Sequence, residues 1–406
     1  MREQLVPELR FPEFEGEWEE KKGKFIFKTI SIKNKGYLDV LSATQDRGVV
    51  YRKDLDMEIQ YDKANLNNYK KVSKTDFVIS LRSFQGGIEC SDIEGIMSPA
   101  YTIFNFKDKE LYSTDFFRVM FKSGDFIRKL DTLTYGVRDG KSISYRDFSS
   151  INFKIPSPQE QQKIGDFFYK IDKKLELQQE KIDNLKKYKK GIMQRIFSQE
   201  IRFKDDNGND YPDWEEKKLE EIVRFIKNYS YSRNDEGEGK YSHIHYGDIH
   251  SRYNGLITKN TVVPKIKSNK EHIELKDGDI IVADASEDYK DLGKTVILLE
   301  KGSRNIIASL HTFALRPNEK LNSIYFLNYS YSDSYKQYMY KKGTGISVFG
   351  INKKNLENMS ILLPSLQEQI KIANFLSSID KKIELEEEKL EEYKKFKKGL
   401  MQRMFI

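Results

Sequence analysis

Cysteine is almost absent from this 406-residue sequence, which contains only Cys90. A single cysteine excludes a disulfide framework and a zinc site built from thiolates, and it fits a reducing compartment. The first residues, MREQLVPELRFPEF, have no apolar segment of the kind that a signal peptide needs, and no run is long and apolar enough to span a bilayer. We therefore expect a soluble protein of the cytoplasm.

Aromatic residues, in contrast, are plentiful. The chain has 25 Phe and 24 Tyr, so it can build cores despite 33% charged residues, and its length predicts two or three domains. The net charge of +7 is not a strong sign of a polyanion partner, because its distribution is uneven. Two segments, 156–197 and 364–405, contribute +4 and +1 of it.

These two segments are copies of one another. They are 42 residues long, lie 208 residues apart and are identical at 25 positions. Each begins with Pro-Ser-x-Gln-Glu-Gln and ends with Lys-Lys-Gly-x-Met-Gln-Arg. Ser157 with Glu160, and Ser365 with Glu368, form capping boxes that predict helix starts. A helix of this length, about 60 Å, exceeds a domain core and indicates a strut.

Apolar residues in both copies recur at steps of four and three, which is the heptad seam of a coiled coil. Both copies interrupt the seam at equivalent places, Gln178 with Glu386 and Lys189 with Lys397. We expect the two helices to pair antiparallel, which gives the chain a pseudo-two-fold axis. The predicted seam residues are Ile164, Phe168, Ile171, Leu175, Ile182, Leu185, Ile372, Leu376, Ile379, Ile383, Leu390 and Tyr393.

The duplication extends upstream of each helix. Arg10-Phe11 leads to Trp18-Glu19-Glu20-Lys21-Lys22, and Arg202-Phe203 leads to Trp214-Glu215-Glu216-Lys217-Lys218. Between these markers and the helices the two halves diverge. Short β-branched and aromatic runs predict strands at 76–80 and 101–106 in the first half, and at 279–283, 296–299 and 312–315 in the second. Polar loops are expected at 83–87 and 286–290.

The fold class is therefore α+β. Two strand-rich α/β domains are each followed by a long helix, and the helices pair as an antiparallel coiled coil. We place the first domain at 1–155, the central helix at 156–198, the second domain at 199–363 and the C-terminal helix at 364–406.

No segment carries a complete catalytic motif. Ser98-Pro99-Ala100-Tyr101 lacks the second proline of an adenine methyltransferase motif and follows no glycine-rich cofactor loop. The segment 288–295 ends in Gly-Lys-Thr, but Asp288 stands where a phosphate loop needs its first glycine. The acids of Pro212-Asp213 and Glu215-Glu216-Lys217 lie too close together for a nuclease motif. We expect no catalytic or cofactor-binding residue in this chain.

All five histidines fall in the second half. His243 and His245, as alternate residues on one face of a strand, could ligate a metal. The sequence places no cysteine or suitably spaced carboxylate beside them, so we predict no metal site and a surface or DNA-facing role.

The twofold alternation of Trp-Glu-Glu-Lys-Lys, a divergent domain, Pro-Ser-x-Gln-Glu-Gln and Lys-Lys-Gly-x-Met-Gln-Arg resembles the specificity subunit of a type I restriction–modification enzyme. The resemblance covers the whole chain. It implies a non-catalytic protein in which each domain reads one half of a bipartite, asymmetric DNA site. The helices would set the spacer and dock two modification subunits, which carry S-adenosylmethionine and methylate adenine, and restriction subunits would complete the complex.

Two alternatives stay open: a self-contained DNA methyltransferase or nuclease, and a structural coiled-coil adaptor. Under the favoured interpretation, side chains on loops and strands read base edges in double-stranded DNA. The predicted DNA-binding residues are Arg47, Tyr51, Arg52, Arg82, Ser83 and Gln85 in the first domain, and His243, His245, Tyr246, Ser286, Tyr289 and His311 in the second.

Overall fold

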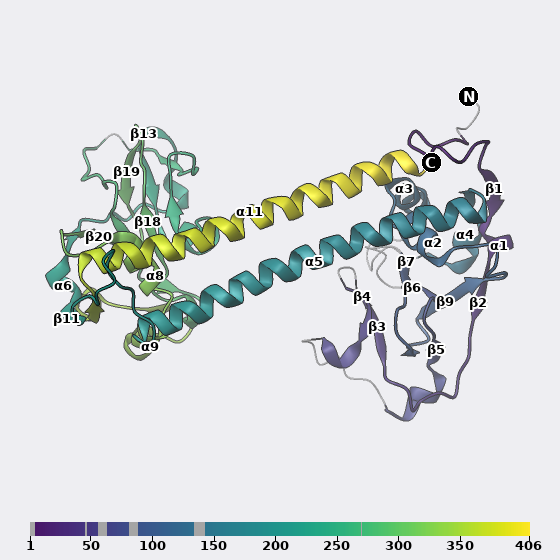
Figure 1. Cartoon of the computed structure of the whole chain (residues 1–406), viewed down its shortest axis with the longest axis horizontal. Coiled ribbons are helices and arrows are strands. Elements are labelled where there is room, and N and C mark those ends of the chain that lie inside the picture. Colours follow the sequence, from purple (N-terminus) through teal and green to yellow (C-terminus); the bar gives the residue numbers. More distant parts are fainter. Residues whose placement is uncertain (1–4, 45–46, 56–62, 81–87, 134–142, 269) are drawn as a thin grey trace. The chain divides into compact units, whose positions relative to one another are not determined.

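The computed structural model describes residues 5–44, 47–55, 63–80, 88–133, 143–268 and 270–406. The chain divides into two compact units, which we call unit 1 (1–180 and 387–406) and unit 2 (181–386). Each unit combines one strand-rich domain with a segment of each long helix (Figure 1). The described residues include no helix that is long and apolar enough to cross a membrane.

Unit 1 is built on a four-stranded antiparallel sheet in the order β2-β9-β6-β7, accompanied by the pairs β3-β4 and β5-β8. The predicted strands at 76–80 and 101–106 are confirmed as β6 and β9. The elements are β1 (Glu19–Lys22), α1 (Gly23–Ile26), β2 (Phe27–Ile30), β3 (Leu41–Thr44), β4 (Gly48–Tyr51), β5 (Lys70–Val72), β6 (Phe77–Ser80), β7 (Ile88–Cys90), β8 (Gly95–Met97), β9 (Tyr101–Phe106), α2 (Thr114–Met120), α3 (Gly124–Thr132), α4 (Tyr145–Ser150) and β10 (Asn152–Ile155).

Phenylalanine fills the core of unit 1. The ring of Phe27 lies 5.3 Å from those of Phe104 and Phe117 and 5.4 Å from that of Phe148, centroid to centroid. All four side chains are buried. Edge-to-face and offset contacts at these separations add to the stability that burial of the rings provides. Many of the phenylalanines of the sequence thus gather in one cluster between the sheet and α2–α4.

Unit 2 contains a five-stranded sheet in the order β12-β20-β16-β18-β14 and a three-stranded sheet in the order β15-β13-β19. The predicted strands at 279–283, 296–299 and 312–315 are confirmed as β16, β18 and β20. The elements are β11 (Glu215–Lys218), α6 (Leu219–Ile222), β12 (Val223–Ile226), β13 (Glu236–Ile244), α7 (Tyr246–Ser251), β14 (Leu256–Ile257), β15 (Lys265–Ile266), β16 (Ile280–Ala283), β17 (Ala285–Ser286), β18 (Thr295–Leu298), β19 (Asn305–Ala308), β20 (Thr312–Pro317), α8 (Ser323–Tyr329), α9 (Asp333–Lys342), β21 (Phe349–Gly350), α10 (Lys353–Glu357) and β22 (Ser360–Leu363).

The recurring Glu-Glu-Lys-Lys segments are strands that pair in the same register in both halves. β1 pairs antiparallel with β10, so that Glu19 faces Ile155, and β11 pairs with β22, so that Glu215 faces Leu363. In both halves, therefore, the strand that opens the domain binds the strand that leads into the long helix. This closes each domain at the base of its helix, and it gives the acids at 215 and 216 a structural role.

The long helices are α5 (Pro158–Phe197) and α11 (Leu366–Met404). Ser157 and Ser365 cap them by accepting hydrogen bonds from the amides of Glu160 and Glu368, each at 3.3 Å. The serine half of each predicted capping box is thus confirmed. The glutamate side chains do something the motif does not predict, because each binds an arginine from the start of its own domain.

Arg10 donates to Glu160 at 2.8 and 2.7 Å, and Arg202 donates to Glu368 at 3.2 and 2.8 Å. Both carboxylates are buried, with side chains 1% and 0% exposed. These hydrogen bonds raise the pKa of both guanidinium groups. We call each pair an arginine clamp. The clamps explain why Arg-Phe recurs so far upstream of each helix.

The helix segments inside each unit run antiparallel. In unit 1, Phe168 contacts Phe405 at 5.9 Å between ring centroids, and further along α5 Lys174 lies 4.2 Å from the ring centroid of Tyr393. In unit 2, Lys189 binds Asp380 at 2.5 Å. The same ion pair recurs in unit 1 between Lys397 and Asp172.

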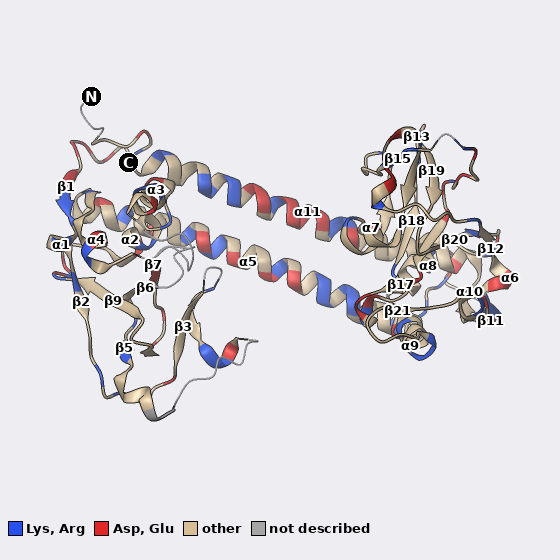
Figure 2. Cartoon of the chain, turned by 180° about the vertical axis from the view of Figure 1, so that it is seen from behind, with Lys and Arg blue, Asp and Glu red and all other residues tan. Residues whose placement is uncertain are grey.

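All twelve predicted seam residues are buried or half-buried, and three of the four positions that interrupt the seam form ion pairs. Lys189 and Lys397 bind the aspartates described above, and buried Glu386 binds Lys181 at 2.9 Å. Figure 2 shows charges of both signs distributed along α5 and α11. Polar pairs in an apolar seam favour one register over shifted ones.

Candidate nucleic-acid interface

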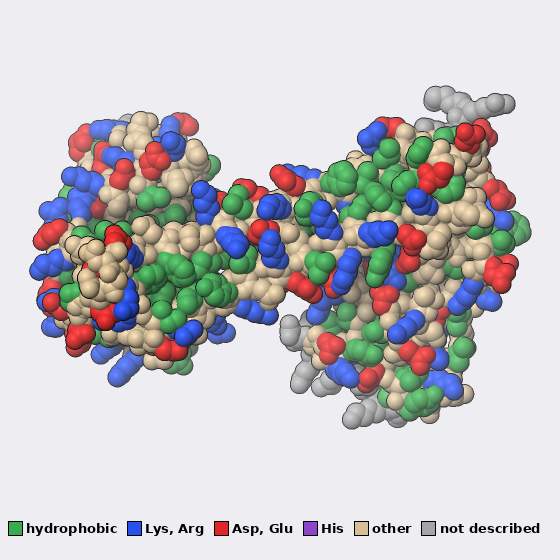
Figure 3. Space-filling view, in the orientation of Figure 1, with side chains coloured by type: hydrophobic (Ala, Val, Ile, Leu, Met, Phe, Trp, Pro, Cys, Tyr) green, Lys and Arg blue, Asp and Glu red, His purple; other side chains and the backbone are tan. Residues whose placement is uncertain are grey.

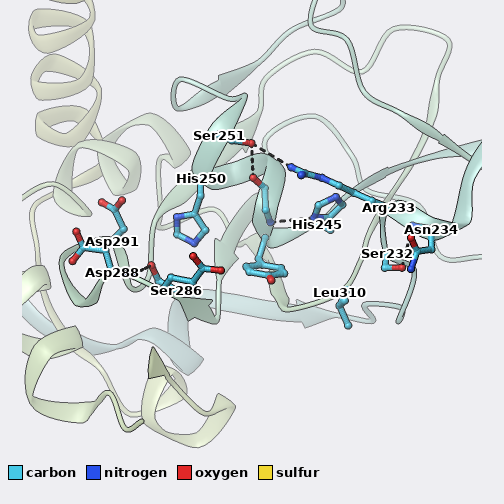
Figure 4. A pocket seen from close by; sticks show the side chains of 13 residues that line it. Ser232, Arg233, Asn234, His245, His250, Ser251, Ser286, Asp288, Asp291 and Leu310 are labelled. Carbon is cyan, nitrogen blue, oxygen red and sulfur yellow. Dashed lines mark hydrogen bonds between the residues drawn. The ribbon is translucent and has the colours of Figure 1, made fainter. Parts of the chain in front are cut away.

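A surface pocket of about 580 Å³ lies in unit 2 between the start of β13, helix α7 and the turn after β17. Its walls carry most kinds of side chain that read base edges. In Figure 4, Arg233 and His245 lie on one side, Asp288 and Asp291 on the other, and His250 between them. The lining residues are Ser232, Arg233, Asn234, His245, Tyr246, Gly247, His250, Ser251, Ser286, Glu287, Asp288, Asp291 and Leu310.

Local structure fixes the two walls. Ser232 caps a single 3-10 turn (Arg233–Asp235) and holds Arg233 and Asn234 outward, both exposed. On the opposite wall Asp288 caps a second 3-10 turn (Tyr289–Asp291). This turn and the strand β18 that follows replace the helix that a phosphate loop requires, which agrees with rejection of that motif.

Three predicted DNA-binding residues of the second domain line this pocket: His245, Tyr246 and Ser286. His311 is adjacent, because its ring centroid lies 5.2 Å from that of Tyr246. It is exposed, and its Nδ1 lies 3.1 Å from Oδ1 of Asp284. Tyr289 belongs to the second turn, and its hydroxyl donates to the carbonyl of Gly343 at 3.2 Å.

His243 requires a correction. Its side chain is fully buried, so it cannot touch a base edge in this conformation. His245 is only 4% exposed and reaches the pocket by one edge. The alternation of the two histidines on one strand face was read correctly, but that face points into the domain. The prediction of no suitably spaced carboxylate is also wrong, because Glu236 and Asp248 both lie beside the two histidines.

In unit 1, the described candidates lie on the β3-β4 hairpin and just after it. Arg47 is exposed in the turn, where its amide donates to Oγ1 of Thr44 at 3.1 Å. Tyr51 ends β4, and Arg52 follows it and donates to Oγ of Ser42 at 3.0 Å. The remaining predicted residues, Arg82, Ser83 and Gln85, lie outside the described residues.

Sequence reasoning did not select the other pocket residues, among them Arg233, Asn234, His250, Asp288 and Asp291. Ser232-Arg233-Asn234-Asp235 carries a signal that could have been used, since serine before an acid three residues on is a capping pattern that turns the intervening side chains outward. His250 carries no such signal. It enters the pocket because its Nε2 lies 2.9 Å from the carbonyl oxygen of Ala285, 35 residues away.

Comparison with known proteins gives a family. Residues 16–187 and 211–395 each match the family described as type I restriction modification DNA specificity domain. This chain therefore belongs to that family and carries its domain twice. The type I restriction enzyme MjaVIII specificity subunit of Methanocaldococcus jannaschii is 27% identical over 279 residues, which cover 64% of this chain and 62% of that relative. The match thus spans less than two thirds of the relative's length.

Solved structures show the same fold across the whole chain. The S subunit of a type I restriction–modification system from M. genitalium aligns with a TM-score of 0.54 and 16% identity, covering 99% of both chains. A chain from a structure that addresses complex assembly and conformational transition of the type I R-M system aligns with a TM-score of 0.60 and 14% identity, covering 96% of this chain and 97% of that one.

Proposed function

We propose that this chain is the DNA-recognition subunit of a type I restriction–modification complex and has no catalytic site of its own. Each strand-rich domain reads one half of a bipartite, asymmetric site in double-stranded DNA. The paired helices set the spacer and dock two modification subunits. Those subunits supply S-adenosylmethionine and adenine methylation, and restriction subunits supply cleavage.

The observation that carries this proposal is the repeated frame around two domains that diverge in sequence. The arginine clamp, the closing strand pair and the long helix recur with the same contacts, and the strand order β2-β9-β6-β7 recurs as β12-β20-β16-β18. Unit 2 differs by adding β14 to this sheet and by a further sheet, β15-β13-β19. Two equal platforms suit two copies of one partner. Two unlike domains suit two unrelated half-sites.

The chain's ends support the same arrangement. In unit 2 the amide of Ile201, just past α5, donates to the carbonyl of Arg195 at 3.0 Å. In unit 1 the amide of Leu9 donates to the carbonyl of Arg403 at 2.9 Å. The N-terminal segment therefore meets the end of α11 as the central linker meets the end of α5. A partner that recognises one helix end and its domain base finds an equivalent surface on the other.

The surface charge fits recognition by shape and side-chain chemistry more than by bulk attraction. Figure 3 shows Lys and Arg side chains interspersed with Asp and Glu on the face it displays. The pocket in unit 2 is likewise lined by side chains of both signs, Arg233 together with Asp288 and Asp291. Carboxylates repel phosphates but accept hydrogen bonds from cytosine N4, and Asn234 matches the edge of adenine. Affinity in the assembled complex would then depend on phosphate contacts from its other subunits.

The proposal is tested by substituting Asn234 in the assembled complex and mapping methylated adenines across the host genome. If Asn234 reads a base, Asn234→Ala relaxes one position of one half-site by about 1–3 kcal/mol. Asn260→Ala, an exposed asparagine outside the pocket, serves as the control and leaves the site unchanged. If both variants methylate the same sites, Asn234 does not read a base and this pocket is not part of the DNA-recognition surface.

The isolated chain provides the discriminating control. It transfers no methyl group from S-adenosylmethionine to DNA unless the modification subunits are added. Methyl transfer by the chain alone, abolished by a point substitution within it, would establish a self-contained methyltransferase and overturn the proposal. A correctly assembled complex that binds all DNA sequences equally would favour the coiled-coil adaptor.

A further inference from the structure

Four side chains with metal-ligating atoms converge behind the pocket of unit 2. They are Glu236 and His243 of β13, His245 immediately after it, and Asp248 of α7. One ligand atom from each lies within 4.8 Å of all the others. Nε2 of His245 is 3.2 Å from Oδ2 of Asp248, and Oε1 of Glu236 is 3.6 and 3.9 Å from Nε2 of His243 and His245. A tetrahedral ion with ligands at about 2.0–2.1 Å needs ligand separations near 3.3 Å.

An irregularity in β13 makes this convergence possible. Glu236 and Tyr241 both pair with Ile266 of β15, so the residues between them form a bulge in the strand. This bulge places Glu236 beside the two histidines. It depends on Gly239, where a Cβ atom would lie 2.0 Å from the carbonyl oxygen of Ile266. Because the bend is set by pairing with a distant strand, the spacing of Glu236 from the histidines gave no metal motif in the sequence.

The cluster is buried and its polar atoms lack partners. His243 and Asp248 are 0% exposed and His245 is 4% exposed. Among the described residues, no hydrogen bond is made by Oε1 of Glu236, by either nitrogen of His243, by Nε2 of His245 or by Oδ2 of Asp248. Buried polar atoms are nearly always paired, because leaving them unpaired costs free energy. The four residues bring one ligand atom each within 4.8 Å of the others, which indicates a ligand that they share.

The second contacts of Asp248 suit a cation at the cluster. Oδ1 of Asp248 accepts from Arg233 and lies 3.3 Å from the guanidinium groups of both Arg233 and Arg252, which leaves Oδ2 for the cluster. A carboxylate that bridges a metal and an arginine holds its orientation through that second contact.

We propose that Glu236, His243, His245 and Asp248 bind one divalent transition-metal ion, with Zn²⁺ as the best match to two imidazoles and two carboxylates. Imidazole nitrogen favours such ions, whereas Ca²⁺ and Mg²⁺ select oxygen ligands. Four protein ligands in a buried position make a closed, structural site. The ion would tie β13 to α7 and fix the wall of the pocket that carries Arg233 and His245.

Binding has one local consequence at His245. Its Nδ1 accepts a hydrogen bond from the amide of Gly247 at 3.1 Å. Ligation through Nε2 places the ring proton on Nδ1, so Nδ1 no longer accepts this hydrogen bond. The freed amide belongs to the first turn of α7, where backbone N–H groups have no partner within the helix.

The test uses the full chain, stripped with a chelator and titrated with ZnCl₂ against a chromophoric competitor. We expect one tightly bound zinc per chain, a rise in the melting temperature with added ZnCl₂, and no comparable rise with MgCl₂ or CaCl₂. Substituting CoCl₂ should give the intense visible absorption of a four-coordinate site. No zinc uptake at micromolar free metal would overturn the proposal.

Substitutions locate the ion. His243→Gln and Glu236→Gln should each weaken zinc binding by more than the roughly 10–100-fold that is lost when a group hydrogen-bonded to a metal ligand is removed. Glu236 is 28% exposed, so its variant keeps the fold if the variant at the buried histidine does not. His272→Gln, outside the cluster, is the matched control. Zinc affinity that is unchanged in Glu236→Gln, or lowered equally in the control, would refute this site. Neither result depends on whether the chain binds DNA.

Discussion

The arginine clamp of unit 2 allows a quantitative prediction. In Arg202→Met the buried carboxylate of Glu368 loses its two hydrogen bonds from the guanidinium. Among the described residues it keeps the indole N–H of Trp214, at 3.1 Å. Breaking a buried ion pair from one side costs roughly 3–5 kcal/mol. Arg202 is 23% exposed, so water relieves part of this cost, and we expect about 3 kcal/mol at the lower end of that range.

The assay is urea unfolding of the full chain in a Trp18→Phe background, in which Trp214 is the only tryptophan and reports on unit 2. Lys259→Met, also in unit 2, is the reference, because its ion pair with Glu300 joins side chains that are 62% and 46% exposed. Such surface pairs contribute about 0–1 kcal/mol. A destabilisation by Arg202→Met that is no larger than this reference would refute the clamp as a stabilising contact.

Two further variants sharpen the result. Adding Glu368→Gln to Arg202→Met removes the stranded charge, so the double variant should be more stable than Arg202→Met alone. In unit 1, Arg10 is 14% exposed, and the indole nitrogen of Trp18 has no hydrogen-bond partner among the described residues. Glu160 therefore lacks the support that Glu368 receives, and Arg10→Met should cost unit 1 more than Arg202→Met costs unit 2.

Two other predictions concern the helix seam and the single cysteine. Leu390 is 6% exposed and Leu385 is 47% exposed on the same helix, so Leu390→Asp should lower the melting temperature or abolish assembly while Leu385→Asp changes neither; equal effects would contradict the seam. Burial raises the pKa of Cys90 to about 12, so the folded chain should not react with a disulfide reagent at pH 8 and should react fully in urea, whereas rapid labelling of the folded chain would contradict this placement.

Local patterns in the sequence predicted the regular elements well. The runs at 101–106 and 312–315 became β9 and β20, because β-branched and aromatic residues suit a pleated, half-buried surface. The predicted seam residues are buried or half-buried, since a helix buries residues at steps of four and three whatever its partner is. Both signals depend only on residues that are close in sequence.

Contacts between distant residues were not predictable in this way. Nothing in the sequence says that Arg10 and Glu160, 150 residues apart, form an ion pair. The same limit produced the error at His243. Its alternation with His245 predicted a common strand face, but whether that face met solvent or Glu236 depended on how β13 pairs with β15.

The proposed division of labour between domains and helices is tested most directly by exchanging one domain. Residues 11–155 are replaced by the first domain of another family member, which keeps Arg10, Glu160 and both long helices. Methylated adenines are then mapped genome-wide in cells that also contain the modification subunits. The account predicts that one half-site changes while the other half-site and the spacer between them stay the same. A change in the spacer or in the other half-site would contradict it.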